Sequence, residues 1–115
     1  MQKPTIYLGA DHAGWAVKEA IEAWLKEGGY TVVDMGNEHL VEHDDYPDFG
    51  HAVAKRVTSD PGSLGIVSCG SAQGICIVAN KVKGVRAATG FNKEVAQSSR
   101  NDDNANILCV PVSYT

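Results

Sequence analysis

Hydrophobic positions follow two different spacings along the chain, and each spacing predicts its own kind of element. Short apolar runs rich in β-branched residues are typical of buried strands. They predict five strands, over residues 5–8, 30–34, 64–68, 85–89 and 107–110. The segments between them place apolar residues three and four positions apart, which is the stripe of an amphipathic helix.

The first predicted helix has the clearest stripe, which ends at Gly28 and Gly29 because glycine favours helix C-caps. Its apolar positions are Val17, Ala20, Ile21, Trp24 and Leu25. Further helices are predicted from Pro47 to the break at Pro61, over 75–81 and over 92–101. Strands that alternate with helices imply right-handed crossovers and a parallel sheet covered on both faces, an α/β fold. In such a fold ligands bind beyond the carboxyl ends of the strands, so we expect the chemistry after the first, third and fifth strands.

The composition is that of a globular domain and narrows the possible partners. The 115 residues are 43% hydrophobic and 21% charged, which suits a single domain over residues 1–115. The net charge is −4 and the ten Lys and Arg are scattered, so nucleic acid is not an expected partner. A small anionic substrate stays open, because helix N-termini and backbone N–H groups bind phosphate without a positive net charge.

The three cysteines are Cys69, Cys76 and Cys109. Their odd number and their spacing predict neither a disulfide framework nor a structural zinc site. The chain begins without the apolar segment of a signal peptide and has no apolar stretch long enough to span a bilayer. Free thiols persist in reducing compartments, so we expect a cytoplasmic protein with no membrane partner.

Polar side chains follow the first predicted strand, in the turn Asp11-His12-Ala13-Gly14. Carboxylate and imidazole groups in that place can bind a polar ligand or move protons. The alternative is structural: Asp11 caps the following helix and His12 faces solvent.

The turn after the third strand, Cys69-Gly70-Ser71-Ala72-Gln73-Gly74, combines a thiol with small residues. Glycines let the backbone approach a ligand, and successive N–H groups at a helix start form a nest for an anion. We expect these groups to lower the pKa of Cys69 and make it the most reactive thiol, with Cys76 and Cys109 buried and inert. A structural cysteine in a tight turn is the alternative. Ile75 stands where a C-x5-R cysteine phosphatase needs arginine, and no Walker A lysine follows the glycine.

Two further segments are rich in polar groups. Residues 99–106 suit an Asx-rich turn, and they also offer donors and acceptors that we expect at the same edge of the sheet as Cys69. The acidic loop 36–45 and the residues after it hold possible metal ligands at no usual spacing, so we expect a solvated loop and no metal. These residues are His39, His43, Asp44, Asp45, Asp48 and His51.

Several stretches, in their order and spacing, resemble the ribose-5-phosphate isomerase B and LacAB galactose-6-phosphate isomerase family. They are residues 11–14, 45–48, 65–71, 79–88, 99–100 and 104–108. The resemblance implies a three-layer α/β/α Rossmann-like fold with a five-stranded parallel sheet. It also implies a homodimer with sites between subunits, and no metal or organic cofactor.

The activity that the resemblance implies is aldose–ketose isomerisation of a sugar phosphate, foremost ribose 5-phosphate and ribulose 5-phosphate. Cys69 would move a proton between C2 and C1 through an enediolate, and Ile75, where other members have Glu, marks the cysteine type. The Ser71 hydroxyl and the backbone N–H groups from Gly70 to Gly74 would hold the oxyanion. The substrate-binding positions would be Asp11, His12, Tyr46, Gly70, Ala72, Gln73, Gly74 and Asp103.

The chain departs from the family pattern in three places. The family reads Ser-Arg-x-His-Asn-Asp, whereas Asp102 stands here at the position of the ring-opening His and Asp103 at that of Asn. Either Asp102 serves as the base or ring opening is slow. Ala72 replaces a glycine, and because positive φ strains alanine we expect a reshaped turn. Family members continue into a helix with phosphate-binding arginines, whereas the sequence ends at Thr115.

These departures leave other functions open. The chain is alternatively a catalytically impaired or partner-dependent subunit, or a sugar-phosphate binding module. A third alternative is an interaction domain that binds no small ligand.

Overall fold

Strands and helices alternate throughout the computed structural model, which describes residues 3–35, 46–70, 72–90 and 92–112. In chain order the elements are β1 (Ile6–Ala10), α1 (Trp15–Glu27), β2 (Val32–Asp34), α2 (Tyr46–Ser59), β3 (Leu64–Cys69), α3 (Gln73–Asn80), β4 (Ala87–Thr89), α4 (Lys93–Asn101) and β5 (Ile107–Pro111). Each predicted strand and helix is present, with its ends moved by a residue or two. The predicted loop 36–45 lies outside the described residues. None of the helices in the described part has the length and apolar character needed to span a membrane.

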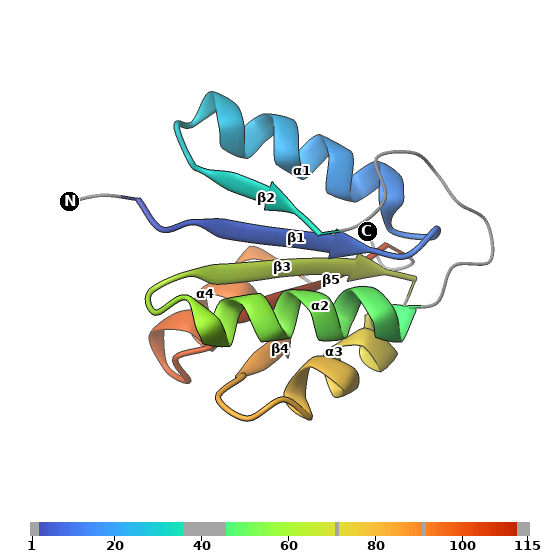
Figure 1. Cartoon of the computed structure of the whole chain (residues 1–115), viewed down its shortest axis with the longest axis vertical. Helices are drawn as coiled ribbons and strands as arrows, with labels where there is room; N and C mark the ends of the chain where they lie inside the picture. Colours follow the sequence, from blue (N-terminus) through green and yellow to red (C-terminus); the bar gives the residue numbers. More distant parts are fainter. Residues whose placement is uncertain (1–2, 36–45, 71, 91, 113–115) are drawn as a thin grey trace.

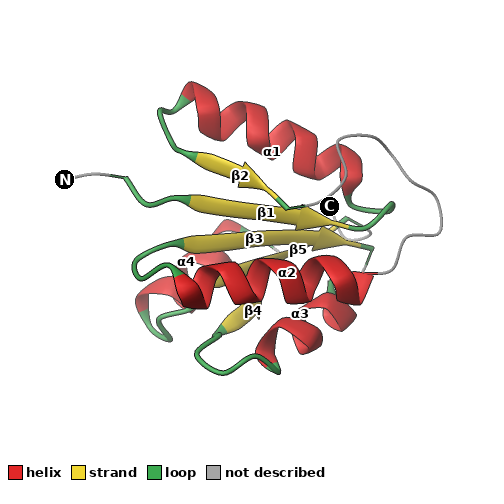
Figure 2. Ribbon diagram, viewed as in Figure 1, coloured by secondary structure: helices red, strands yellow, loops and turns green. Residues whose placement is uncertain are grey.

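The five strands form one parallel sheet in the order β2-β1-β3-β5-β4, and the strand arrows in Figure 1 point the same way. The crossovers from β1 to β2 and from β4 to β5 run in one direction across the sheet, and those from β2 to β3 and from β3 to β4 run in the other direction. Right-handed crossovers therefore place α1 and α4 on one face and α2 and α3 on the other. Figure 2 shows helices on both sides of the sheet, and α2 packs on α3, β1 and β3. The three-layer α/β/α prediction is confirmed, with the topological switch between β1 and β3.

The interior strand β1 is buried along its whole length, which explains its uninterrupted apolar sequence. Ile6 and Leu8 join Leu25 of α1 in one apolar cluster. Tyr7, on the opposite face, joins a larger cluster beneath α2 and α3. Both faces of the sheet are therefore packed, and the accessible part of the central strands is their ends.

Candidate active site

The turns after β1 and β3 meet at the carboxyl-terminal edge of the sheet. Ala10 pairs with Ser68, so the two strands end side by side. The Ser68 hydroxyl donates a hydrogen bond of 2.9 Å to the carbonyl of Gly14. A Cβ on Gly14 would lie 2.3 Å from the Ser68 carbonyl oxygen. The start of α1 therefore lies directly against the end of β3, and only glycine leaves room for that contact.

Asp11 is buried in the turn after β1, with 7% of its surface exposed. Its Oδ1 accepts a hydrogen bond of 3.1 Å from the backbone N–H of Gly14, so it shapes the turn that starts α1. Its charge also acts on the Cys69 thiol. His12, the next residue, is exposed. Asp11 therefore shapes the turn before α1 without capping the helix, because the N-cap is Gly14 and has no side-chain cap hydrogen bond. The predicted capping role is wrong, and Asp11 instead lies beside the candidate base.

The Cys69 thiol, at the end of β3, is buried and accepts hydrogen bonds from backbone N–H groups of Ala72, Ile75 and Gly70. Burial raises the pKa of this thiol above its usual value, and the Asp11 carboxylate raises it further. The N–H groups oppose the rise without reversing it. The expected lowering of the Cys69 pKa is therefore wrong, because burial and a neighbouring negative charge outweigh the start of α3.

The other two cysteines are buried, as predicted, with Cys76 in α3 and Cys109 in β5. Hydrogen bonds to the Cys109 thiol and the Thr89 hydroxyl lower the pKa of Cys76 to about 6, although burial opposes them. The same hydrogen bond and burial raise the pKa of Cys109. The thiolate form is thus more favoured at Cys76 than at Cys69. Cys69 remains the candidate base because it lies at the carboxyl end of a strand, whereas Cys76 lies within α3.

Ala72 is the N-cap of α3 and has φ 66° and ψ −4°, a left-handed conformation. Its side chain is fully buried in the larger apolar cluster. The expected reshaping is not seen at this residue, since alanine takes the conformation that usually selects glycine. Gly70 and Gly74 are half-buried and Gln73 is exposed. Ser71 and the side chain of Tyr46, which opens α2, lie outside the described part of the molecule.

Asp102 and Asp103 lie at the amino-terminal edge of the sheet, opposite Cys69. Helix α4 begins beyond β4 and returns the chain to the start of β5, so the residues between α4 and β5 are at that edge (Figure 1). The prediction that residues 99–106 share the edge of Cys69 is wrong, because a crossover helix always reverses the strand direction. Both aspartates are exposed, and Asp102 Oδ2 accepts a hydrogen bond of 2.9 Å from the Ser98 hydroxyl.

Comparison with known proteins identifies the family. A family model described as Ribose/Galactose Isomerase matches residues 6–115. The chain belongs to this isomerase family. A probable ribose-5-phosphate isomerase B of Mycoplasma genitalium is 42% identical over 106 residues, which are 91% of this chain and 70% of that protein. The ribose-5-phosphate isomerase B of Mycobacterium tuberculosis is 45% identical over 103 residues, 90% of this chain and 64% of the relative.

Solved structures of isomerases share the fold. The crystal structure of ribose-5-phosphate isomerase B from Mycoplasma genitalium with bound ribulose-5-phosphate is 39% identical, with a TM-score of 0.94. The match covers 100% of this chain and 76% of that chain. The chain therefore spans about two thirds to three quarters of the length of these isomerases.

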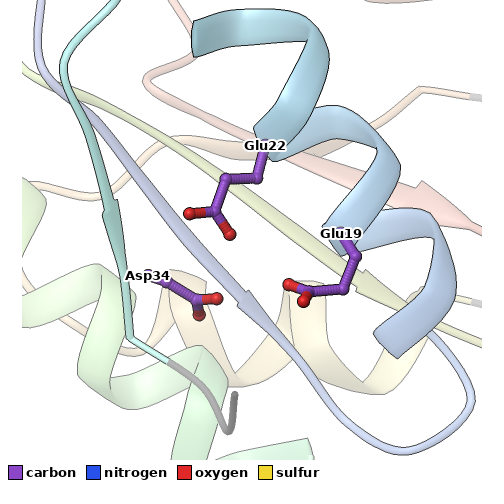
Figure 3. Close-up of side chains that lie close together, drawn as sticks. All are labelled: Glu19, Glu22 and Asp34. Carbon is purple, nitrogen blue, oxygen red and sulfur yellow. The ribbon is translucent and has the colours of Figure 1, made fainter. Parts of the chain in front are cut away.

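Sequence reasoning missed a charged cluster beneath α1 in this member of the isomerase family. Figure 3 shows the carboxylates of Glu19, Glu22 and Asp34 close together. The buried Lys18 Nζ lies 2.6 Å from Asp34 and 3.2 Å from Glu19, and Lys26 lies 2.8 Å from Glu22. Lysines thus pair with the carboxylates, and the Lys18–Asp34 pair ties α1 to β2, so the cluster is structural. Lys18 precedes Ile21 by three residues and the buried Leu25 by seven, and this helical spacing is the sequence signal that places Lys18 on the buried face.

Most of the possible metal ligands lie in the loop 36–45, which is outside the described residues. His39, His43, Asp44, Asp45 and the side chain of Asp48 are not among the described groups, and His51 is exposed on α2. The expectation of a solvated loop without metal stays a prediction.

Proposed function

We propose that the chain is an aldose–ketose isomerase that interconverts ribose 5-phosphate and ribulose 5-phosphate. The observation that carries the proposal is Cys69 at the switch point, with its Sγ facing the N–H groups at the start of α3. The family and the relative with bound ribulose-5-phosphate support the choice of substrate.

The chemistry needs one base and one set of oxyanion donors. The Cys69 thiolate takes the proton from C2 of the open-chain aldose, and the C–H electrons form the C1–C2 double bond of an enediolate. The thiol then returns the proton to C1, while a proton passes from O2 to O1 and leaves the carbonyl at C2. Oxidation at C2 and reduction at C1 balance within the sugar, so the reaction needs no external oxidant.

Backbone donors from Gly70 to Gly74 and the Ser71 hydroxyl are proposed to hold the developing oxyanion, since preorganised donors often supply a large share of catalysis. Asp11, His12 and Tyr46 are proposed to contact the sugar or its phosphate. The raised pKa of Cys69 leaves less thiolate at neutral pH but makes that thiolate a stronger base toward carbon. Turnover is therefore expected to rise with pH through the alkaline range.

Ring opening is proposed to use a second copy of the chain. Asp102 and Cys69 lie at opposite edges of one sheet, roughly 20 Å apart by the rise of a six-residue strand. A side chain does not reach across that distance. In a homodimer with sites between subunits, Asp102 and Asp103 of one copy would lie over Cys69 of the other.

Deuterium exchange tests the base. The protein is incubated with ribose 5-phosphate in deuterium oxide, and C2 deuterium and ribulose 5-phosphate are followed by NMR. Cys69→Ala is expected to lose exchange and product by at least about a hundredfold, the scale of general base catalysis. Cys76→Ala is the control and is expected to keep most activity. Saturable binding of ribose 5-phosphate without exchange would instead identify a sugar-phosphate binding module.

Complementation tests the shared site. Cys69→Ala and Asp102→Ala chains are each expected to turn over closed-ring substrate poorly. After equal mixing and reassociation, half of the dimers are mixed, and each of those holds one site with both native groups. About a quarter of wild-type activity should return by this symmetry. A mixture no more active than its parts would show that Asp102 of a second copy does not serve Cys69.

A further inference from the structure

A second hollow opens at the amino-terminal edge of the sheet, opposite Cys69. It has a volume of about 430 Å³ and lies between the turn before β3, the turn before β4 and the segment before β5. Its polar lining includes Lys83, Arg86, Arg100, Asn104 and Asn106. Small-molecule sites in proteins commonly enclose about 300–1,000 Å³, so the hollow has room for more than a bare phosphate.

The charge of this hollow is opposite to that of the whole chain. Its lining contains three cationic side chains and, within the described residues, no Asp or Glu. The chain as a whole carries a net charge of −4. Asp103 lines a different hollow, beside Glu94 on α4. The three cations therefore produce a local positive potential in a concave place, which attracts anions.

The two arginines are held in place by neutral acceptors. Arg86 Nε donates to the Asp103 carbonyl at 2.7 Å. Arg100 Nη1 donates to the Ala105 carbonyl at 2.8 Å and to Asn104 Oδ1 at 3.0 Å. Each arginine uses one guanidinium nitrogen in these bonds, and neither has a carboxylate within ion-pair distance among the described residues. Their positive charges are oriented without being neutralised.

The wall of the hollow is also tied together. Asn106 Oδ1 accepts the backbone N–H of Arg86 at 2.8 Å, and Asn106 Nδ2 donates to the Gly84 carbonyl at 3.0 Å. The turn that carries Lys83 and Arg86 is thus bonded to the segment before β5. Preorganisation of this kind lowers the cost of ordering the site when a ligand binds.

We propose that this hollow binds the phosphoryl group of a small phosphorylated metabolite between Lys83, Arg86 and Arg100. Planar guanidinium groups suit phosphate oxygens, and lysine adds a third charge. The proposed isomerase reaction uses none of these three side chains, so a phosphoryl site between them goes beyond that reaction. Inorganic phosphate presents the same chemistry, and the two sources are distinguished below.

The test is an NMR titration of the ¹⁵N-labelled full chain with sodium phosphate and with ribose 5-phosphate, at constant ionic strength set with chloride. Saturable shifts of the Gly84, Arg86 and Asn106 amide signals are expected, while Gly70 and Gly74 report the Cys69 turn independently. Lys83→Glu is expected to weaken binding at the first group by roughly tenfold or more, as for the loss of one charge-assisted hydrogen bond. Lys81→Glu is the matched control, since Lys81 is exposed and outside the lining, and is expected to leave affinity unchanged.

Each outcome of the titration either supports or overturns the phosphoryl site. Tighter binding of ribose 5-phosphate than of phosphate at Gly84 and Asn106 supports a metabolite site, and equal affinity supports the phosphoryl site with inorganic phosphate as its ligand. Ligand-induced shifts confined to Gly70 and Gly74 would overturn the hollow as a site while leaving the isomerase proposal standing. If Lys81→Glu weakens binding as much as Lys83→Glu does, the binding comes from the general surface charge, and the proposed site is wrong. Tighter binding of a short single-stranded oligonucleotide at the same amides would replace the metabolite by nucleic acid.

Discussion

Two turns meet at the carboxyl-terminal edge of the sheet, and each contains a position where glycine is the usual choice for a different reason. Gly14, before α1, has an ordinary backbone conformation, with φ −98° and ψ 0°, but no space for a side chain. Ala72, before α3, has the left-handed conformation, with φ 66°, yet its methyl group packs in the core. Lack of space excludes every side chain, whereas an unfavourable dihedral costs a limited amount that packing offsets.

The same two turns also differ in how they treat charge. The first buries the Asp11 carboxylate and bonds it to the Gly14 N–H. The second buries a thiol whose pKa that carboxylate helps to raise. The first turn therefore acts on the second both through packing and through its field, and four substitutions test this relation.

The largest effect is expected for Gly14→Ala. A Cβ would lie 2.3 Å from the carbonyl oxygen and 2.4 Å from the carbonyl carbon of Ser68, which are backbone atoms that yield little. The free energy of unfolding should fall by about 3 kcal/mol or more, as in severe overpacking. Urea denaturation measures it, with Gly62→Ala as a control where space is open but φ is positive. A loss no larger than the control's would show that α1 simply moves away.

A smaller effect is expected for Ser68→Ala, which removes the hydrogen bond to the Gly14 carbonyl. The cost should be about 1 kcal/mol, because the same carbonyl still accepts the Lys18 N–H within α1. Thermal unfolding checks the change. Comparison of Ser68→Ala with Gly14→Ala separates the effect of the hydrogen bond from the effect of the close steric contact. A loss of stability as large as that of Gly14→Ala would show that the hydrogen bond matters as much as the lack of space.

Asp11→Asn changes the charge and retains an oxygen that accepts the Gly14 N–H. Because the carboxylate raises the pKa of Cys69, its removal lowers that pKa and increases the thiolate fraction at neutral pH. Alkylation of Cys69 by iodoacetamide, followed by peptide mass spectrometry against pH, should shift to lower pH and become severalfold faster at pH 7. Labelling of Cys76 serves as the internal control. An unchanged profile at Cys69 would mean that the carboxylate does not act on the thiol.

The smallest effect is expected for Ala72→Gly. Glycine relieves roughly 1–2 kcal/mol of left-handed strain, but it gives up a buried methyl group worth about 0.8 kcal/mol and adds backbone entropy to the unfolded chain. The free energy of unfolding should change by less than about 1 kcal/mol. Chemical denaturation decides the matter, and a large loss would show that the methyl group is essential to the packing of α3.

Much of the candidate site followed from the sequence because strand ends obey simple rules. Asp11 and Cys69 each follow a buried apolar run, and parallel strands bring such residues to one edge. Residues 99–106 were misplaced because they precede a strand, and the direction of α4 carries them to the other edge. The sign of the Cys69 pKa shift was also missed, since it depends on burial by residues far along the chain.

Local spacing determined the order and type of the elements in this protein, because helical and strand periodicities depend on near neighbours. The family resemblance came from the sequence as well, through short motifs in order. Tertiary structure alone decided the contact between Gly14 and Ser68, the ion pair between Lys18 and Asp34, and the gathering of Lys83, Arg86 and Arg100 around one hollow. Each of these depends on how strands stack into the order β2-β1-β3-β5-β4. That order depends on packing contacts on both faces of the sheet, made by residues that are far apart in the chain, and local sequence patterns do not predict such contacts.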